Sequence, residues 1–213
     1  MALSKYITQT RRLLHDPNGQ LWSDAQLTDY INDGRNRVCQ DTKCLRQITS
    51  VTLTAGVEQY TIATLADSLG LAPFIVDVMG IDLYWGSTRY SLSYAPWTTF
   101  NANLRYWQNL QQRPIAFTRA GALSVYFGPI PDQAYLTDWN VSINPNTLVT
   151  DSTPEQIPVP FTEPVQYWAA YQAKFYEQAM GEANLFENEY KKRVLMNQRS
   201  FMTRVIPDPY MTG

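Results

Sequence analysis

Residues 161–205 read FTEPVQYWAAYQAKFYEQAMGEANLFENEYKKRVLMNQRSFMTRV, and the rest of the fold is organised around this stretch. Pro158 and Pro160 exclude a helix before it, and the hydroxyl of Thr162 is placed to cap the first free amides. Apolar residues then recur at helical spacing on both sides of Gly181. We therefore predict a long helix, a break at Gly181 and a second helix that runs nearly to the C-terminus.

The first of these helices carries more apolar surface than a single amphipathic stripe needs. Aromatic and methionine side chains widen the stripe, so the helix requires neighbours on more than one side. Two interpretations stay open: a central position in a helical subdomain, or a contact between subunits. For a subunit contact, the predicted interface residues are Tyr167, Tyr171, Phe175 and Met180.

Two further helices are predicted at the start of the chain. The first covers residues 2–15 and ends at the turn Asp16-Pro17-Asn18-Gly19. The second opens at Ser23, whose hydroxyl can cap while Gln26 reaches back. Gly34 falls on its apolar face, which indicates either that another helix passes close there or that a weak position is tolerated.

Between residues 48 and 160 the apolar period changes from 3.6 to 2, which indicates β structure. Ala55-Gly56 and Gly86-Ser87 are predicted to close hairpins, residues 97–107 to form a short helix, and residues 135–143 to form the longest alternating strand. The spacing of these segments predicts about six to eight antiparallel strands.

The predicted fold class is α+β, with an antiparallel β domain inserted into a four-helix subdomain and followed by an extended C-terminal tail. The N-terminal helices occupy residues 1–47, the β domain 48–160, the C-terminal helices 161–205 and the tail 206–213. Two prolines exclude helix from this tail, and ordering it costs about 1.5 kcal/mol per residue. Its apolar side chains must therefore bury against a surface for it to be ordered.

The composition limits the classes of function that the protein can have. A net charge of −2 and a pI near 5.4 disfavour a surface that binds nucleic acid by neutralising phosphates. No stretch approaches the ~20 apolar residues of a membrane helix, and no signal peptide is evident, so we expect a soluble chain that is intracellular at synthesis and has no membrane partner. The 14 Tyr and 6 Trp residues favour interfaces, where an apolar ring with a polar group is useful.

Reactive groups do not form a recognisable site in the sequence. His15 is the single histidine, and the glycines are scattered as turn formers rather than gathered in a phosphate-binding loop. Cys39 and Cys44 lack the spacing of a redox or zinc pair. A solvated helical face accounts for three regularly spaced carboxylates better than a cation site does: Asp24, Asp29 and Asp33. We predict no enzymatic activity, no cofactor and no metal.

Several segments, taken in chain order, resemble the head-to-tail adaptor (head-completion) proteins of tailed bacteriophages. They are YITQTRRLL at 6–14, the turn Asp16-Pro17, WSDAQLTDYIN at 22–32, VYFGPIPD at 125–132, and the helix at 163–176. The resemblance implies a virion protein of the neck, which forms a ring of about twelve copies below the portal protein. It further implies that the ring extends the channel for double-stranded DNA, which passes without specific binding, and that it provides the attachment site for tail or nozzle proteins.

The same family uses its C-terminal part to engage the portal. By this resemblance the predicted portal-binding residues are Phe201, Met202, Val205, Ile206, Pro207, Tyr210 and Met211. Prolines reduce the entropy that such a peptide loses on docking, and the apolar side chains act as anchors.

Other functions fit the residues as well. A tail nozzle or neck-completion ring protein would share this composition and differ in its partner. A β-domain module that binds carbohydrate or peptide would use exposed tryptophans, for which the candidates are Trp85, Trp97, Trp107 and Trp139. A hydrolase with an unrecognised site is disfavoured by the single histidine.

Overall fold

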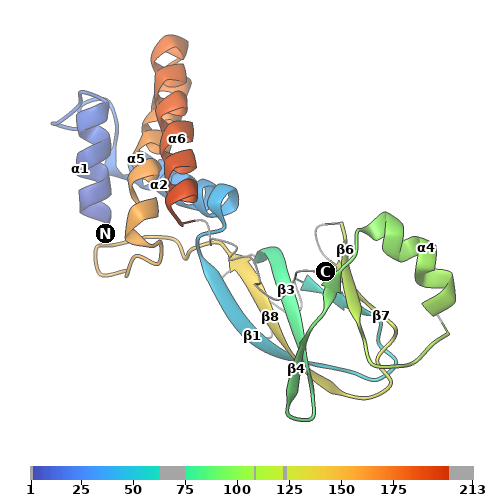
Figure 1. Ribbon diagram of the computed structural model, residues 1–213. Helices are drawn as coiled ribbons and strands as arrows, with labels where there is room; N and C mark the ends of the chain where they lie inside the picture. Colours follow the sequence, from blue (N-terminus) through green and yellow to red (C-terminus); the bar gives the residue numbers. More distant parts are fainter. Residues whose placement is uncertain (1, 63–74, 108, 122–123, 202–213) are drawn as a thin grey trace. The chain divides into compact units, whose positions relative to one another are not determined.

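The computed structural model describes residues 2–62, 75–107, 109–121 and 124–201, with the backbone alone at 103–107, 200 and 201. It combines helices with largely antiparallel sheets, so the predicted α+β class is confirmed (Figure 1). The chain divides into a helical unit, built from the segments before residue 43 and after residue 146, and a β unit over Lys43–Asn146. Residues 147–160 thus belong to the helical unit, although the sequence placed them with the strands.

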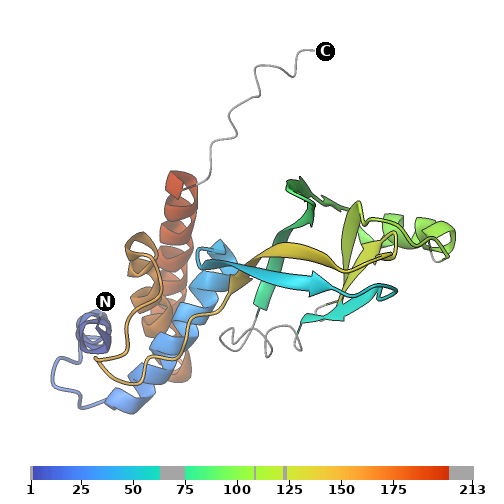
Figure 2. The same cartoon turned by 90° about the horizontal axis from the view of Figure 1, so that it is seen from below.

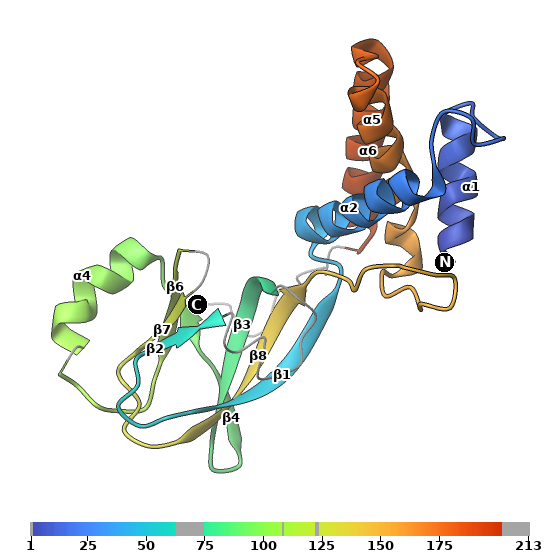
Figure 3. The ribbon, with the colours of Figure 1, turned by 180° about the vertical axis from the view of Figure 1, so that it is seen from behind.

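The helical unit consists of α1 (Leu3–Leu13), α2 (Asp24–Thr42), the short 3₁₀ turn η1 (Val159–Phe161), α5 (Glu163–Tyr176) and α6 (Met180–Phe201). Helix α5 contacts α1, α2 and α6, and α6 runs alongside it (Figures 1 and 3). Its small residues Ala169, Ala170 and Ala173 are buried, which lets these neighbours approach closely. Most of α5 therefore occupies a central position in the helical unit, which was one of the two interpretations of its wide apolar surface.

Gly34 marks the closest approach of α2 to α5. A Cβ atom at Gly34 would lie 3.0 Å from the carbonyl oxygen of Val165 and 3.3 Å from Cδ1 of Trp168. Real Cβ atoms rarely tolerate such distances, so the glycine permits the helices to touch here. The interpretation that another helix passes close to Gly34 is the correct one.

The break between the last two helices is not at Gly181, which lies in the first turn of α6. Gln178 instead adopts a left-handed φ of 63°. Its amide bonds the carbonyl of Phe175 at 3.0 Å, and the Ala179 amide bonds that of Lys174 at 3.0 Å. These two bonds form a Schellman motif, which usually has glycine at the left-handed position. Because glutamine rather than glycine occupies this position, the helix end could not be predicted from the sequence.

The start of α5 also differs from the prediction, because η1 leads directly into it. Thr162 has helical backbone angles and makes no side-chain cap. Its hydroxyl donates to the carbonyl of Val159 at 2.7 Å. At α2 the predicted capping box is confirmed: the Gln26 amide donates to the Ser23 hydroxyl, and the Gln26 side chain accepts from the Ser23 amide at 3.1 Å.

The β unit contains two four-stranded sheets (Figure 3). The first has the order β1 (Arg46–Leu53), β8 (Tyr135–Ile143), β3 (Ile75–Trp85) and β4 (Thr88–Ser91). The second has the order β2 (Gln59–Thr61), β7 (Ser124–Gly128), β6 (Ala116–Ala120) and β5 (Ser93–Tyr94). Side chains from both sheets share one core, whose largest members are Trp139, Phe117 and Phe127.

Several predictions for this unit are confirmed. Gly86, with φ of 61°, lies in the turn of the β3–β4 hairpin. Helix α4 covers Trp97–Trp107 and packs on β6 and β7 (Figure 2). Strand β8 covers the predicted range, with alternate side chains buried along most of its length.

Two predictions about strand pairing are wrong. Ala55-Gly56 does not close a hairpin, because β1 pairs with β8 and β2 pairs with β7 in the other sheet. The long alternating strand β8 offers β1 eight paired positions, which the three residues of β2 cannot match. The sheets are also not wholly antiparallel, since β5 pairs in parallel with β6 after the α4 crossover.

Candidate interaction surfaces

No assembled reactive site is found in the described part of the chain. Its His, Cys, Asp and Glu residues form no group of three that could hold a metal ion. Asp24 pairs with Arg11 at 2.7 Å, and Asp33 accepts a bond from Gln172 at 3.4 Å. Among the described helices, none combines the length and hydropathy needed to cross a bilayer. Interaction surfaces are therefore the features to consider.

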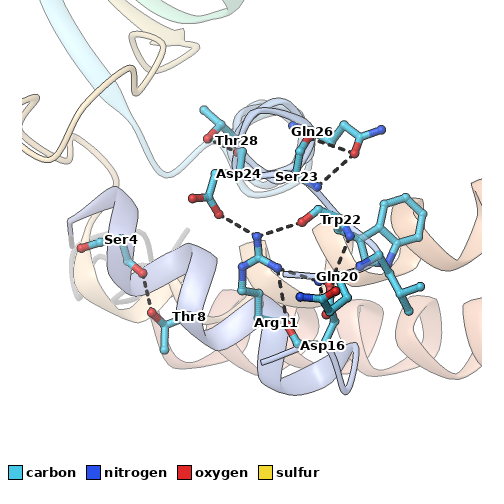
Figure 4. Close-up of polar contacts among 11 residues, drawn as sticks. Ser4, Thr8, Arg11, Asp16, Gln20, Trp22, Ser23, Asp24, Gln26 and Thr28 are labelled. Atoms are coloured by element: carbon cyan, nitrogen blue, oxygen red, sulfur yellow. Dashed lines mark hydrogen bonds and ion pairs between the residues drawn. The ribbon is translucent and has the colours of Figure 1, made fainter. Parts of the chain in front are cut away.

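Asp16 organises the corner between α1 and α2 (Figure 4). Its carboxylate accepts the amides of Gln20, Leu21 and Trp22 at 2.8, 3.0 and 3.1 Å and pairs with Arg11 at 3.3 Å. Burial by itself raises the pKa of Asp16, but these amide bonds and the Arg11 charge lower it by more. The sequence identified Asp16 only as a turn residue, because its acceptor role depends on how the loop folds around it.

A row of aromatic rings leads from the core of the helical unit to its surface. Buried Tyr190 contacts Trp168 at 5.0 Å between ring centroids, and Trp168 contacts Tyr171 at 5.1 Å. The row continues through Phe175 at 5.9 Å and Tyr176 at 6.3 Å. Each ring thus contacts the one before it, from the core to the surface.

The outer end of this row is exposed. We call Tyr30, Tyr171, Phe175 and Tyr176 the aromatic patch. Tyr30 stacks on Tyr176 at 5.6 Å with an interplanar angle of 13°. Phe175 is 46% exposed and Tyr176 67% exposed. A cluster of Tyr and Phe rings with two exposed members has the composition of a protein interface rather than of an ordinary surface.

The four predicted interface residues differ in exposure. Phe175 and Met180 are exposed, whereas Tyr167 and Tyr171 are half-buried. The guanidinium of Arg193 lies 3.9 Å from the ring centroid of Tyr167 and covers one of its faces. Tyr176 and Tyr30 join the patch although neither was among the predicted interface residues.

A buried ion pair connects residues 147–157 to α2. Arg35 and Glu155 have side chains 1% and 3% exposed, and Nη2 of Arg35 lies 2.8 Å from Oε1 of Glu155. Burial raises the pKa of Glu155, but the bonds from Arg35 and the Ile157 amide lower it by more. Leu148 and Ile157 are buried in the same segment, which explains why it belongs to the helical unit.

The tryptophans proposed for the alternative carbohydrate- or peptide-binding module differ in exposure. Trp139 is buried, and its Nε1 donates to the Thr137 hydroxyl at 2.8 Å, so its predicted exposure is wrong. Trp85 and Trp97 are partly exposed, and the side chain of Trp107 lies outside the described residues. Trp85 is the one that a cation covers, since the guanidinium of Arg113 lies 4.3 Å from its ring centroid.

The predicted portal-binding residues lie at the end of the chain. Phe201 ends α6, but its side chain is outside the described set. The remaining six, in 202–211, also lie outside the described residues, so their role stays a prediction.

The described residues thus form a two-unit α+β chain with an aromatic patch on its helical unit. The model of the family described as SU10 adaptor protein matches residues 1–208. The chain therefore belongs to the SU10 adaptor protein family, a family of phage head–tail adaptors. No curated protein matches it. The resemblance seen in the sequence is confirmed at this family level, and membership supports a structural rather than an enzymatic role.

Proposed function

We propose that this protein forms a ring in the virion neck, below the portal protein, where it extends the DNA channel and provides the attachment site for the tail. The observation that carries the proposal is family membership over residues 1–208, which covers both units. A ring of about twelve copies needs a heterologous interface, in which one face of a copy meets a different face of the next.

The aromatic patch supports such an interface. Phe175 and Tyr176 are exposed although the rest of their helix is central to the unit, and Met180 is exposed on the next helix. Tyr171 contacts Phe175 at 5.9 Å between ring centroids, and both Tyr167 and Tyr171 are half-buried. Exposed rings cost free energy in an isolated subunit, and a neighbouring copy would remove them from water.

The proposed role requires two further properties, which are attachment to the portal and free passage of DNA. The C-terminal residues from Phe201 to Met211 would dock on the portal, with Ile206, Tyr210 and Met211 as anchors. DNA must slide through the ring, which a net charge of −2 permits, because a strongly basic lining would hold the phosphates.

The test is the oligomeric state of the purified chain, alone and with portal protein, by light scattering. We expect a ring for the natural sequence, and smaller species for the double substitution Phe175→Ser and Tyr176→Ser. Val149→Ser is the matched control, since Val149 is 71% exposed in the same unit but outside the patch. A chain that stays monomeric with portal, while virions assemble normally without it, would remove the ring proposal. Binding to tail proteins but not to portal would favour the nozzle alternative.

A further inference from the structure

Two aromatic rings of the β3–β4 hairpin lie beside the guanidinium of Arg113. The guanidinium carbon of Arg113 lies 4.3 Å from the ring centroid of Trp85 and 4.7 Å from that of Tyr90. Trp85 is 53% exposed and Tyr90 39% exposed, so the pair of rings holds the cation at the surface. The two ring centroids lie 6.0 Å apart, so the rings contact the guanidinium from adjacent directions rather than from opposite faces. An arginine held in this way can still donate hydrogen bonds through its planar edge.

In the described part of the chain, Arg113 lacks the ion pair that two other arginines of its unit form. Arg89 pairs with Asp82 and Arg119 with Asp77, each at 2.6 Å. Within the described residues Arg113 forms no ion pair, and its Nη1 is buried without a hydrogen-bond partner. Because Nη1 is buried, a partner's acceptor would reach the guanidinium at its other nitrogens, where a charge-assisted hydrogen bond is stronger than a neutral one.

The surroundings of Arg113 indicate what would bind. It lines an open depression of about 390 Å³ together with Trp85, Gln112, Ile115 and Asp132. Ile115 is 53% exposed, so the depression combines apolar surface with amide groups and one cation. Trp, Tyr and Arg are the residue types that dominate binding energy in protein interfaces.

From these features we infer that the Arg113 cradle, defined as Arg113, Trp85, Tyr90 and Ile115, binds a protein partner through a carboxylate flanked by an apolar side chain. The carboxylate meets the edge of the guanidinium, and the apolar group contacts Ile115 and the exposed ring of Trp85. A nucleic acid fits less well, because the site offers a single cation, whereas binding to a phosphate backbone depends on several Lys and Arg side chains.

The experiment uses the full chain and two blocked dipeptides, N-acetyl-Leu-Glu-amide and the uncharged N-acetyl-Leu-Gln-amide. The indole N–H signal of Trp85, assigned with Trp85→Phe, is followed by NMR during titration. We expect a saturable shift with the Glu peptide, with a Kd on the order of 1–10 mM for so small a ligand, and binding at least about tenfold weaker for the Gln peptide.

Variants locate the contact. Arg113→Gln should abolish the difference in affinity between the two peptides. Arg113→Lys should weaken binding of the Glu peptide, because lysine cannot present the same planar edge. Arg46→Gln, at an exposed position, is the control and should leave binding of the Glu peptide unchanged. Equal response to the two peptides, or no saturable response, overturns the inference without requiring any variant to fold.

A second pair of probes decides between partner classes. If inorganic phosphate or a short DNA duplex binds the cradle more tightly than the Glu peptide, the cradle is an anion or nucleic-acid site and the inference is wrong. The outcome does not depend on ring formation, because the titration reports on the hairpin of a single copy.

Discussion

Asp16 is a residue whose effect on stability follows from its hydrogen bonds. We predict that Asp16→Asn lowers the free energy of unfolding at pH 7, because it removes the Arg11 ion pair and weakens three amide bonds. The folded state lowers the pKa of Asp16, so the stabilisation is present in full above the unfolded value near 4 and is lost as pH falls through the folded value.

The check is urea unfolding of both proteins from pH 7 to pH 3. The stability difference between natural protein and variant should shrink toward acid. A difference that stays constant with pH would show that the carboxylate charge at Asp16 is not what stabilises the corner. Lys5→Gln, an exposed change on the same helix, serves as the control.

Arg35 and Glu155 provide a second prediction at the level of single residues. Glu155→Gln should cost about 3–5 kcal/mol, because it leaves the Arg35 charge buried without a counter-charge. The double substitution Arg35→Met and Glu155→Leu should cost less than Glu155→Gln alone, since an apolar pair removes both buried charges. Chemical denaturation of the single and double variants measures this, and additive losses would contradict it.

The pKa of Glu155 sets the pH dependence of that pair. It is lowered in the folded state, so its stabilisation is complete above the usual glutamate value of 4.5 and declines as pH falls below it.

At the level of elements, the contact between α2 and α5 can be tested with one pair of substitutions. Gly34→Ala places a Cβ atom 3.0 Å from a backbone oxygen, and overpacking of this kind costs roughly 1–3 kcal/mol. Gly181→Ala lies in the first turn of α6 with no atom within 4 Å, so the intrinsic helix preference of alanine should stabilise by up to about 1 kcal/mol.

The melting temperature should therefore fall for Gly34→Ala and rise for Gly181→Ala, although the chemical change is the same. If Gly34→Ala raises the melting temperature as Gly181→Ala does, then the two helices do not meet as closely as the structure has them.

For the whole molecule, we predict that the C-terminal peptide is needed for attachment to the portal but not for folding. Deletion of residues 207–213 should leave the melting temperature within error, because it removes none of the buried core residues of the described part. It should weaken binding to portal protein. Tyr210→Ala is the finer change, expected to cost about 2 kcal/mol of binding if the ring is a buried anchor. Binding of the truncated chain that equals that of the full chain would exclude the peptide as the docking segment.

The sequence by itself determined most of the local elements. Helical spacing located four of the helices of the helical unit, alternation located β8, and the Ser23–Gln26 pair identified the start of α2, because each signal lies within a few residues of the feature it controls. The order of segments was also sufficient to indicate the family.

Only the tertiary structure decided which elements meet. The turn at Ala55-Gly56 indicates a change of direction but does not identify the partner of β1, which lies about eighty residues away in β8. Arg35 pairs with Glu155, which lies 120 residues later in the sequence. Arg113 contacts two rings of a hairpin that precedes it in the chain. Such contacts depend on the free energy of the whole packed unit, whereas periodicity and capping report only on neighbouring residues.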